Sequence, residues 1–92
     1  MPLTKRTEVL DPRRKRLLYR ATHCGMKEND VLIGRFATAR LEELSEELVD
    51  QLENLMNHTD NDLHNWVTGR EPTPDFVESD VLRMVKEFNG TL

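Results

Sequence analysis

Apolar residues recur along most of the chain at intervals of three and four, the period that places side chains on one face of an α-helix. The alternating apolar and polar runs that are typical of half-buried β-strands do not compete with this pattern. Capping residues, glycines and prolines separate the apolar segments by short connections, which favour helices that fold back on their neighbours. The pattern therefore predicts an all-α fold, a compact bundle of about five short helices.

The first predicted helix covers residues 12–24. Asp11 followed by Pro12 is typical of an N-cap and a first helical residue. The apolar stripe of this helix stops at Gly25, which we interpret either as a left-handed helix terminus or as a point of close backbone approach by a partner. The stripe consists of Leu17, Leu18, Ala21 and Cys24.

The second predicted helix covers residues 27–44. Glu28 and Asp30 lie in its first turn, where carboxylates favour the positive end of the helix dipole. Its apolar face is wide enough to contact two neighbouring helices. That face consists of Leu32, Ile33, Phe36, Ala37, Ala39 and Leu41.

Two short helices are expected in the middle of the chain. Ser45 is a typical N-cap for a third helix, and Asp60 is our predicted N-cap for a fourth helix that ends at Gly69. We interpret Trp66 as a core residue of the fourth helix rather than a binding residue. The remaining apolar positions of these two helices are Leu48, Leu52, Leu55, Met56, Leu63 and Val67.

The last predicted helix follows a new start at Thr73 and Pro74 and ends at Gly90. Its apolar positions recur at offsets of 4, 7, 8 and 11 from the first, as expected for one helical face. They are Val77, Val81, Met84, Val85 and Phe88.

Composition limits the chain to one domain. With 92 residues, of which 37% are hydrophobic, it is long enough for one core, so we expect a single domain over residues 11–92 after a flexible tail at residues 1–10. No run of about 18 apolar residues is present, which predicts a soluble protein without membrane insertion. Cys24 is the only cysteine, so an intramolecular disulfide is impossible and a reducing compartment is favoured, either a bacterial-type cytoplasm or a mitochondrial matrix.

Charge is distributed unevenly along the chain. Residues 1–27 carry a net charge of +6, whereas residues 28–92 carry −10. A basic first quarter is compatible with a nucleic-acid-binding helical module, but phosphate would repel the acidic helices that follow, so we expect no nucleic acid as a partner. A solvated helix face explains the same residues equally well.

Residue patterns that perform catalysis are missing from the sequence. The four glycines are too scattered for a phosphate-binding loop. His23 and Cys24 are adjacent, so their side chains diverge on a helix and do not form a nucleophile and base. His58 and His64 flank two aspartates, but a solvated turn explains them better than a metal site because zinc-ligand spacing is lacking. We therefore expect no enzyme, no metal and no stably bound cofactor.

Residues 23–30 are unusual because they join a basic helix to an acidic one. In order and spacing, four short segments of the chain resemble the SdhE family of succinate dehydrogenase assembly factors. These segments are residues 16–19 (RLLY), 25–28 (GMKE), 34–37 (GRFA) and 60–66 (DNDLHNW). With a similar closing helix, the resemblance extends over residues 12–89.

The resemblance implies a helper that binds the flavoprotein subunit of succinate dehydrogenase, or of fumarate reductase, and promotes covalent attachment of FAD to it. In that family the first helix ends in an Arg-Gly-x-x-Glu motif, and Cys24 stands here at the position of the arginine. The resemblance places partner binding at the corner between the first two helices, and we expect the chain to act as a monomer. The partner-binding residues predicted in this way are Arg20, His23, Cys24, Gly25, Met26, Glu28 and Asp30.

Without the resemblance, the corner is also compatible with a small helical adaptor or an antitoxin-like regulatory protein. Glu28 could form a hydrogen-bonded ion pair with a cation of any partner, which would fix orientation more than it adds affinity. The residues alone leave this alternative open.

Overall fold

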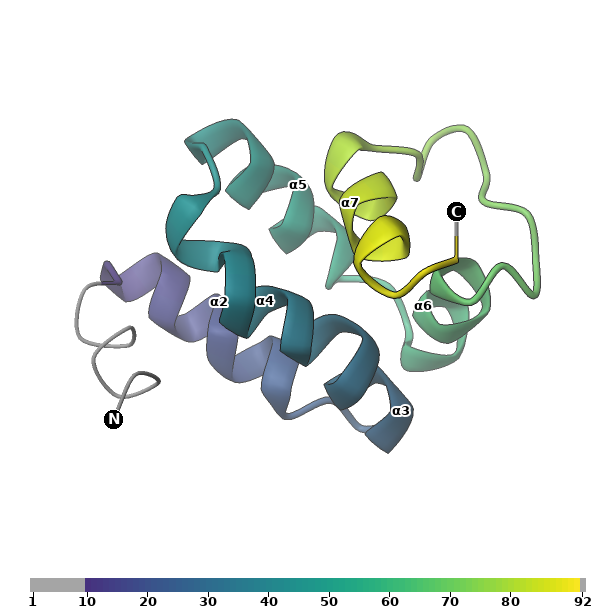
Figure 1. Cartoon of the computed structure of the whole chain (residues 1–92), viewed down its shortest axis with the longest axis horizontal. Coiled ribbons are helices and arrows are strands. Elements are labelled where there is room, and N and C mark those ends of the chain that lie inside the picture. The colour runs from purple at the N-terminus through teal and green to yellow at the C-terminus, as the bar shows by residue number, and fades with distance from the viewer. Residues whose placement is uncertain (1–9, 92) are drawn as a thin grey trace.

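Helices form the framework of the chain, and the computed structural model describes residues 10–91 (Figure 1). The elements are α2 (Pro12–Thr22), α3 (Lys27–Asn29), the π-helix η1 (Asp30–Gly34), α4 (Arg35–Arg40), the 3-10 helix η2 (Leu41–Glu43), α5 (Glu46–Leu55), α6 (Asp60–Val67) and α7 (Asp80–Phe88). The prediction of an all-α fold is confirmed for this part of the chain. The tail predicted for residues 1–10 lies outside the described residues except for Leu10, which is buried.

Helix α2 begins where the sequence indicates. The Asp11 side chain accepts a hydrogen bond from the backbone N–H of Arg14 at 2.8 Å, and Pro12 follows as the first helical residue. The helix ends at Thr22, two residues earlier than predicted, because His23 leaves the helical conformation with φ −132° and ψ 48°.

The second predicted helix is a continuous but irregular segment over residues 27–43. It changes from α to π geometry at Asp30, returns to α at Arg35 and tightens to 3-10 geometry at Leu41. A π-turn inside an α-helix is rare and occurs mostly as a single-turn bulge, frequently at functional sites. Here its first residue, Asp30, is also the last residue of the segment 23–30 that joins the first two predicted helices.

The N-caps of the next two helices lie within one residue of the predictions. Ser45 caps α5 as expected, by accepting a hydrogen bond from the backbone N–H of Leu48. For α6 the prediction was wrong: Thr59 is the N-cap, and its hydroxyl accepts from the N–H of Asp62 at 3.2 Å. Gly69, with φ +76°, follows the end of α6 in the left-handed conformation that was predicted.

The start of the last helix was also predicted wrongly. Residues 74–77 form a turn in which the N–H of Val77 donates to the carbonyl of Pro74 at 2.9 Å. Helix α7 begins only at Asp80, after the N-cap Ser79. Pro74 is therefore a turn residue, whereas Gly90, with φ +73°, ends the helix as expected.

One continuous core connects the helices. Its largest fully buried side chains are Phe36, Leu17, Ile33, Leu41, Leu52, Leu63 and Leu82, of which Leu82 was not predicted. Trp66 is buried, in agreement with its predicted structural role, but Phe88 is 40% exposed and contacts the ring of Phe36 edge-on. Within residues 10–91, no helix is both long and apolar enough to cross a membrane.

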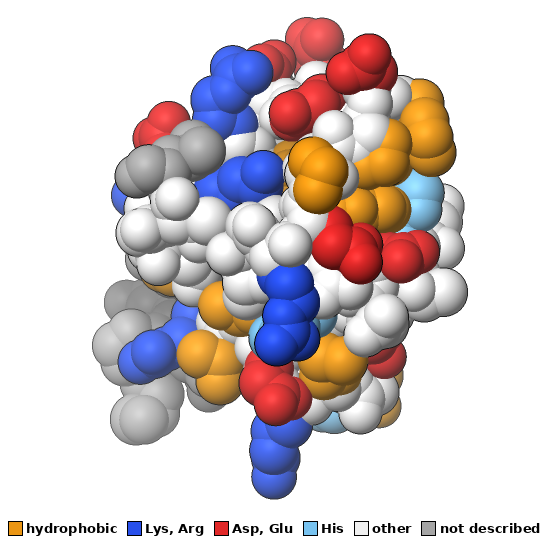
Figure 2. Space-filling model, turned by 90° about the vertical axis from the view of Figure 1, so that its right-hand side faces the viewer, with side chains coloured by type: hydrophobic (Ala, Val, Ile, Leu, Met, Phe, Trp, Pro, Cys, Tyr) orange, Lys and Arg blue, Asp and Glu red, His pale blue; other side chains and the backbone are white. Residues whose placement is uncertain are grey.

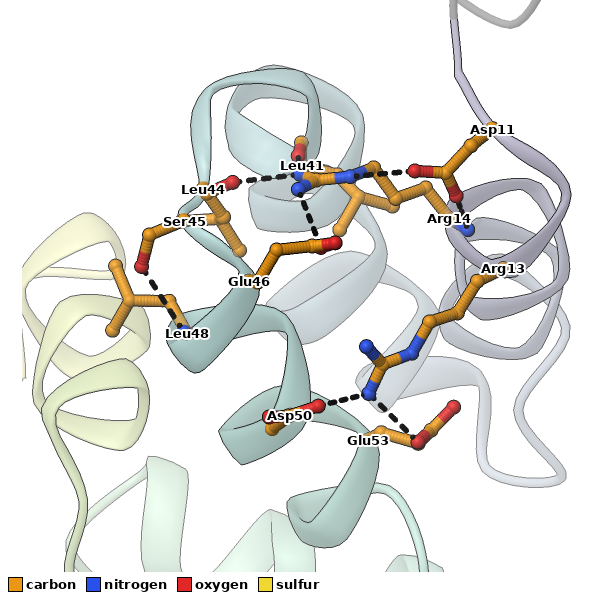
Figure 3. A network of polar contacts seen from close by, with 10 residues as sticks. All are labelled: Asp11, Arg13, Arg14, Leu41, Leu44, Ser45, Glu46, Leu48, Asp50 and Glu53. Carbon is orange, nitrogen blue, oxygen red and sulfur yellow. Dashed lines mark hydrogen bonds and ion pairs between the residues drawn. The ribbon is translucent and has the colours of Figure 1, made fainter.

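Two arginines of α2 attach this helix to the elements beside it (Figure 3). The Arg14 guanidinium donates to the carbonyls of Leu41 and Leu44 at 2.6 and 2.7 Å, so it satisfies carbonyls at the end of the second helical segment. Arg13 contacts the carboxylates of Asp50 and Glu53 on α5. Both side chains are thereby committed to contacts within the chain.

Candidate docking corner

The docking corner, residues 23–30, connects α2 to the second helical segment and includes the short helix α3, which packs against α6 (Figure 1). Three residues, Gly25, Asn29 and Asp30, determine how closely these elements approach one another. The geometry of the corner therefore depends on contacts within the chain.

Two hydrogen bonds hold the corner in shape. The Asp30 carboxylate accepts from the backbone N–H of Cys24 at 2.5 Å, which closes the loop between the two helical segments. The fully buried Asn29 donates through its Nδ2 atom to the backbone carbonyl of Asp60 at 2.9 Å, which attaches the corner to the start of α6. Asp30 therefore shapes the corner from within.

Gly25 lies in a close contact with α6 and not in a left-handed conformation. Its φ angle is not positive, so the interpretation of Gly25 as a left-handed helix terminus was wrong. A Cβ atom added at Gly25 would lie 2.5 Å from Oδ2 of Asp60. A close approach is present within the chain itself, where the carboxylate of Asp60 on α6 occupies the space of the missing side chain. Close approach by a partner stays a prediction.

Gly34 makes a close contact with backbone atoms at the end of the π-helix. A Cβ atom at this position would lie 2.8 Å from the backbone carbonyl oxygen of Ala21 and 3.3 Å from the Cα atom of Thr22. Gly34 is therefore the position at which the second helical segment crosses the last turn of α2.

The Cys24 thiol is held in its protonated form. Burial, followed by the negative charges of Asp30 and Asp60, raises the pKa of Cys24 from 9.0 to about 11. Its sulfur donates to the backbone carbonyls of Arg20 and Ala21 at 3.5 and 3.4 Å. A thiol with so high a pKa supplies almost no thiolate at neutral pH, and the thiolate is the nucleophilic form.

The basic side chains near the corner make contacts of their own. The Arg20 guanidinium donates to the carbonyl of Met56 at 2.9 Å and to Oδ1 of Asn57 at 3.1 Å, across the connection between α5 and α6. The His23 ring stacks on Tyr19 with a centroid distance of 4.0 Å, and Nδ1 of His23 lies 2.9 Å from the Tyr19 carbonyl oxygen. The two side chains thus frame the corner on its α2 side.

Glu28 and Lys27 face solvent. Both are exposed, and neither side chain has a hydrogen-bond or ion-pair partner among residues 10–91. Met26 is partly buried, and its carbonyl accepts from the N–H of Asn29 at 3.0 Å. Of the predicted site residues, Glu28 is therefore the charged side chain that is free to bind another molecule.

Residues outside the predicted set complete the corner. Asn29, Gly34 and Asp60 were not predicted as site residues. Asn29 precedes the core residues Ile33 and Phe36 by four and seven positions, so its place on an apolar helical face was a signal of burial. The contact of Asp60 with Gly25 depends on how α6 packs, which no local pattern indicates.

The structure weakens the interpretation of the N-terminal part as a nucleic-acid-binding surface. Arg13, Arg14 and Arg20 all donate hydrogen bonds within the chain, so they are less available to phosphate groups. Over the described part of the chain, no group of three or more His, Cys, Asp and Glu side chains could hold a metal ion.

Over residues 10–91, the fold and this corner define a small all-α domain that presents a charged corner of fixed shape. A family model described as "Flavinator of succinate dehydrogenase" (Sdh5) matches residues 15–89, which include the whole corner. The chain belongs to this family, as the resemblance in the sequence indicated.

Several relatives carry the same name, succinate dehydrogenase assembly factor 2, mitochondrial. The protein from Danio rerio is 41% identical over 83 residues, which cover 88% of this chain and 52% of the relative. The protein from Kluyveromyces lactis is 36% identical over 94 residues, 97% of this chain and 58% of the relative. That from Dictyostelium discoideum is 37% identical over 73 residues, 79% of this chain and 52% of the relative. The chain spans about half the length of these relatives.

Proposed function

We propose that this chain binds the flavoprotein subunit of succinate dehydrogenase and promotes the covalent attachment of FAD to that subunit. The match of residues 15–89 to the flavinator family is the observation that carries this proposal. The mitochondrial relatives, named as assembly factors of the same enzyme, support it and favour the mitochondrial matrix or its bacterial counterpart, the cytoplasm, as the place of action.

In this proposal the chain acts as a monomeric, non-catalytic helper. The flavin and the residue to which it becomes attached both belong to the partner. The chain holds the partner in a reactive geometry and does not bind FAD stably itself. Positioning alone can lower a barrier by several kcal/mol. The protonated Cys24 thiol supports this division of roles, because it is not set up as a nucleophile.

The partner-binding surface in this proposal is the docking corner, with Glu28 as its free carboxylate. Because Cys24 stands at the position of the family's arginine, no cation at this position offsets the negative charges of Asp30 and Asp60. A cationic group of the flavoprotein would be attracted to this corner.

The function is tested by deleting the gene and measuring covalent flavin in the succinate dehydrogenase and fumarate reductase flavoproteins by in-gel fluorescence. We expect a strong loss in the former; an unchanged signal in both would refute the proposal. The surface is tested by a pull-down with Gly25→Arg and Glu28→Ala beside Glu47→Ala, a matched exposed glutamate on α5. Equal recovery of the flavoprotein with all variants would place the binding surface elsewhere.

A further inference from the structure

A cavity outside the docking corner lies between the second half of α5 and the segment that leads into α7. Its volume is about 440 Å³, and Leu55 and Val77, both buried, contribute its apolar lining. Phe76 lines the same cavity although its side chain is 84% exposed, the most exposed large hydrophobic residue in the described part of the chain. The ring of Phe76 therefore offers an accessible aromatic surface at the edge of the cavity.

Hydrogen bonds fix the walls of this cavity. The turn that carries Phe76 is closed by the N–H groups of Val77 and Glu78, which donate to the Pro74 carbonyl at 2.9 and 3.2 Å. On the opposite side, Oε1 of Gln51 on α5 accepts from the backbone N–H of Val81 at 3.0 Å. The cavity therefore keeps its shape without a ligand, so binding would require little ordering.

The charge around the cavity is negative. Glu78 and Asp80 line it, and residues 71–80 contain four acidic residues without a lysine or arginine. Figure 2 shows acidic side chains gathered at the upper end of this face of the molecule, next to exposed hydrophobic side chains. Asp80 has Arg83 at 4.0 Å, a distant and exposed pair, whereas the Glu78 side chain has no partner among residues 10–91. Glu78 is thus available to a cation.

An anionic ligand is disfavoured at the same place. The start of α7 could attract an anion, but Ser79 and Gln51 already accept hydrogen bonds from the N–H groups of Leu82 and Val81. The carboxylates of Glu78 and Asp80 would also repel an anion in the cavity. A cation with an apolar stem fits both the acidic rim and the apolar lining.

We infer that this cavity receives an arginine side chain of the flavoprotein subunit, an inference that rests on the proposed function. The planar guanidinium can stack on the ring of Phe76 while it forms charge-assisted hydrogen bonds with the carboxylate of Glu78. Arginine is favoured over lysine because its planar, weakly hydrated head group stacks on aromatic rings and pairs with carboxylates through two donors. The cavity and the docking corner would then form two separate contacts with one partner.

The test measures the Kd of the purified chain for the flavoprotein subunit by isothermal titration calorimetry. We expect Phe76→Ala and Glu78→Gln each to raise the Kd about tenfold. The double variant should raise the Kd by less than the product of the two single effects, because Phe76 and Glu78 contact the same arginine side chain. Phe76→Tyr, which keeps the aromatic ring, should retain affinity. Glu47→Gln is the matched control for the exposed carboxylate. Phe76 and Glu78 are both exposed, so the variants should keep the wild-type melting curve.

Different failures have different meanings. If the wild-type chain binds and the Phe76→Ala and Glu78→Gln variants bind equally well, the cavity inference is refuted while the proposed function stands. If the wild-type chain does not bind the flavoprotein at all, both are refuted. If the effects of the two single variants on the Kd multiply in the double variant, Phe76 and Glu78 do not contact the same arginine. A Phe76→Tyr variant that binds as weakly as Phe76→Ala would also contradict the inference.

Discussion

The crossing at Gly34 allows a quantitative test of how closely the first two helical segments pack. Gly34 has ordinary helical angles, φ −62° and ψ −41°, so alanine is conformationally allowed and would by propensity alone stabilise the helix by about 1 kcal/mol. The added Cβ, however, would lie 2.8 Å from the carbonyl oxygen of Ala21, a backbone atom that cannot rotate away. Helix propensity and steric conflict thus predict changes of opposite sign in the free energy of unfolding.

We expect the steric conflict to dominate. Overpacking at a well-packed site costs about 1–3 kcal/mol, and a contact with buried backbone belongs to the upper part of that range, so Gly34→Ala should destabilise the fold by a net of about 1–2 kcal/mol. For a domain of this size, this corresponds to a decrease in melting temperature of roughly 5–15 °C. The measurement is thermal and urea unfolding followed by circular dichroism at 222 nm.

A double variant identifies the atom responsible. The Cβ would also lie 3.3 Å from Cγ2 of Thr22, a contact that Thr22→Ala removes, whereas the contact with the Ala21 carbonyl stays. We therefore expect Thr22→Ala to rescue little of the loss caused by Gly34→Ala. Gly25→Ala is the milder comparison, because its added Cβ meets the carboxylate end of the Asp60 side chain, which can rotate. A Gly34→Ala variant that melts at or above the wild-type temperature would refute the reasoning.

Three further predictions concern the contacts around the corner. Arg14→Lys should destabilise the fold by about 1–3 kcal/mol in urea unfolding, because lysine lacks the planar fork that donates to two carbonyls; wild-type stability would contradict the role of this clamp. Asn29→Ala should cost a similar amount, since it leaves the Asp60 carbonyl without its donor, and it should increase amide exchange at the start of α6. Because the folded-state pKa of Cys24 is raised to about 11, its contribution to stability is complete below pH 9.0 and is lost as the pH rises through 11. The stability difference between wild type and Cys24→Ser should therefore change only over that range, and a difference independent of pH would contradict the raised pKa.

The sequence predicted those features of the fold that local chemistry determines. Asp11 with Pro12, Ser45 and Gly69 act at helix ends as expected, because a cap involves residues only a few positions apart. The N-cap of α6 was misassigned since Thr59 and Asp60 are both good capping residues and lie next to each other.

Features that depend on packing between distant segments could not be predicted in this way. The π-turn at residues 30–34, the crossing at Gly34 and the contact between Gly25 and Asp60 all arise where elements far apart in sequence meet. The start of α7 was predicted too early because Val77 continues the helical spacing of the core while its backbone forms a turn. Glu28 is exposed, and its predicted role in partner binding stays a prediction.

The two hydrogen bonds that hold the docking corner in shape have a consequence for how its recognition can evolve. The side chains of Asn29 and Asp30 hold the corner together, whereas those of Lys27 and Glu28 are exposed and have no hydrogen-bond or ion-pair partner among residues 10–91. Substitutions at the displayed positions can therefore alter partner preference without dismantling the scaffold beneath them. Divergent members of such a family could exchange one specificity for another at little risk to folding, and a designer could randomise the same positions for that purpose.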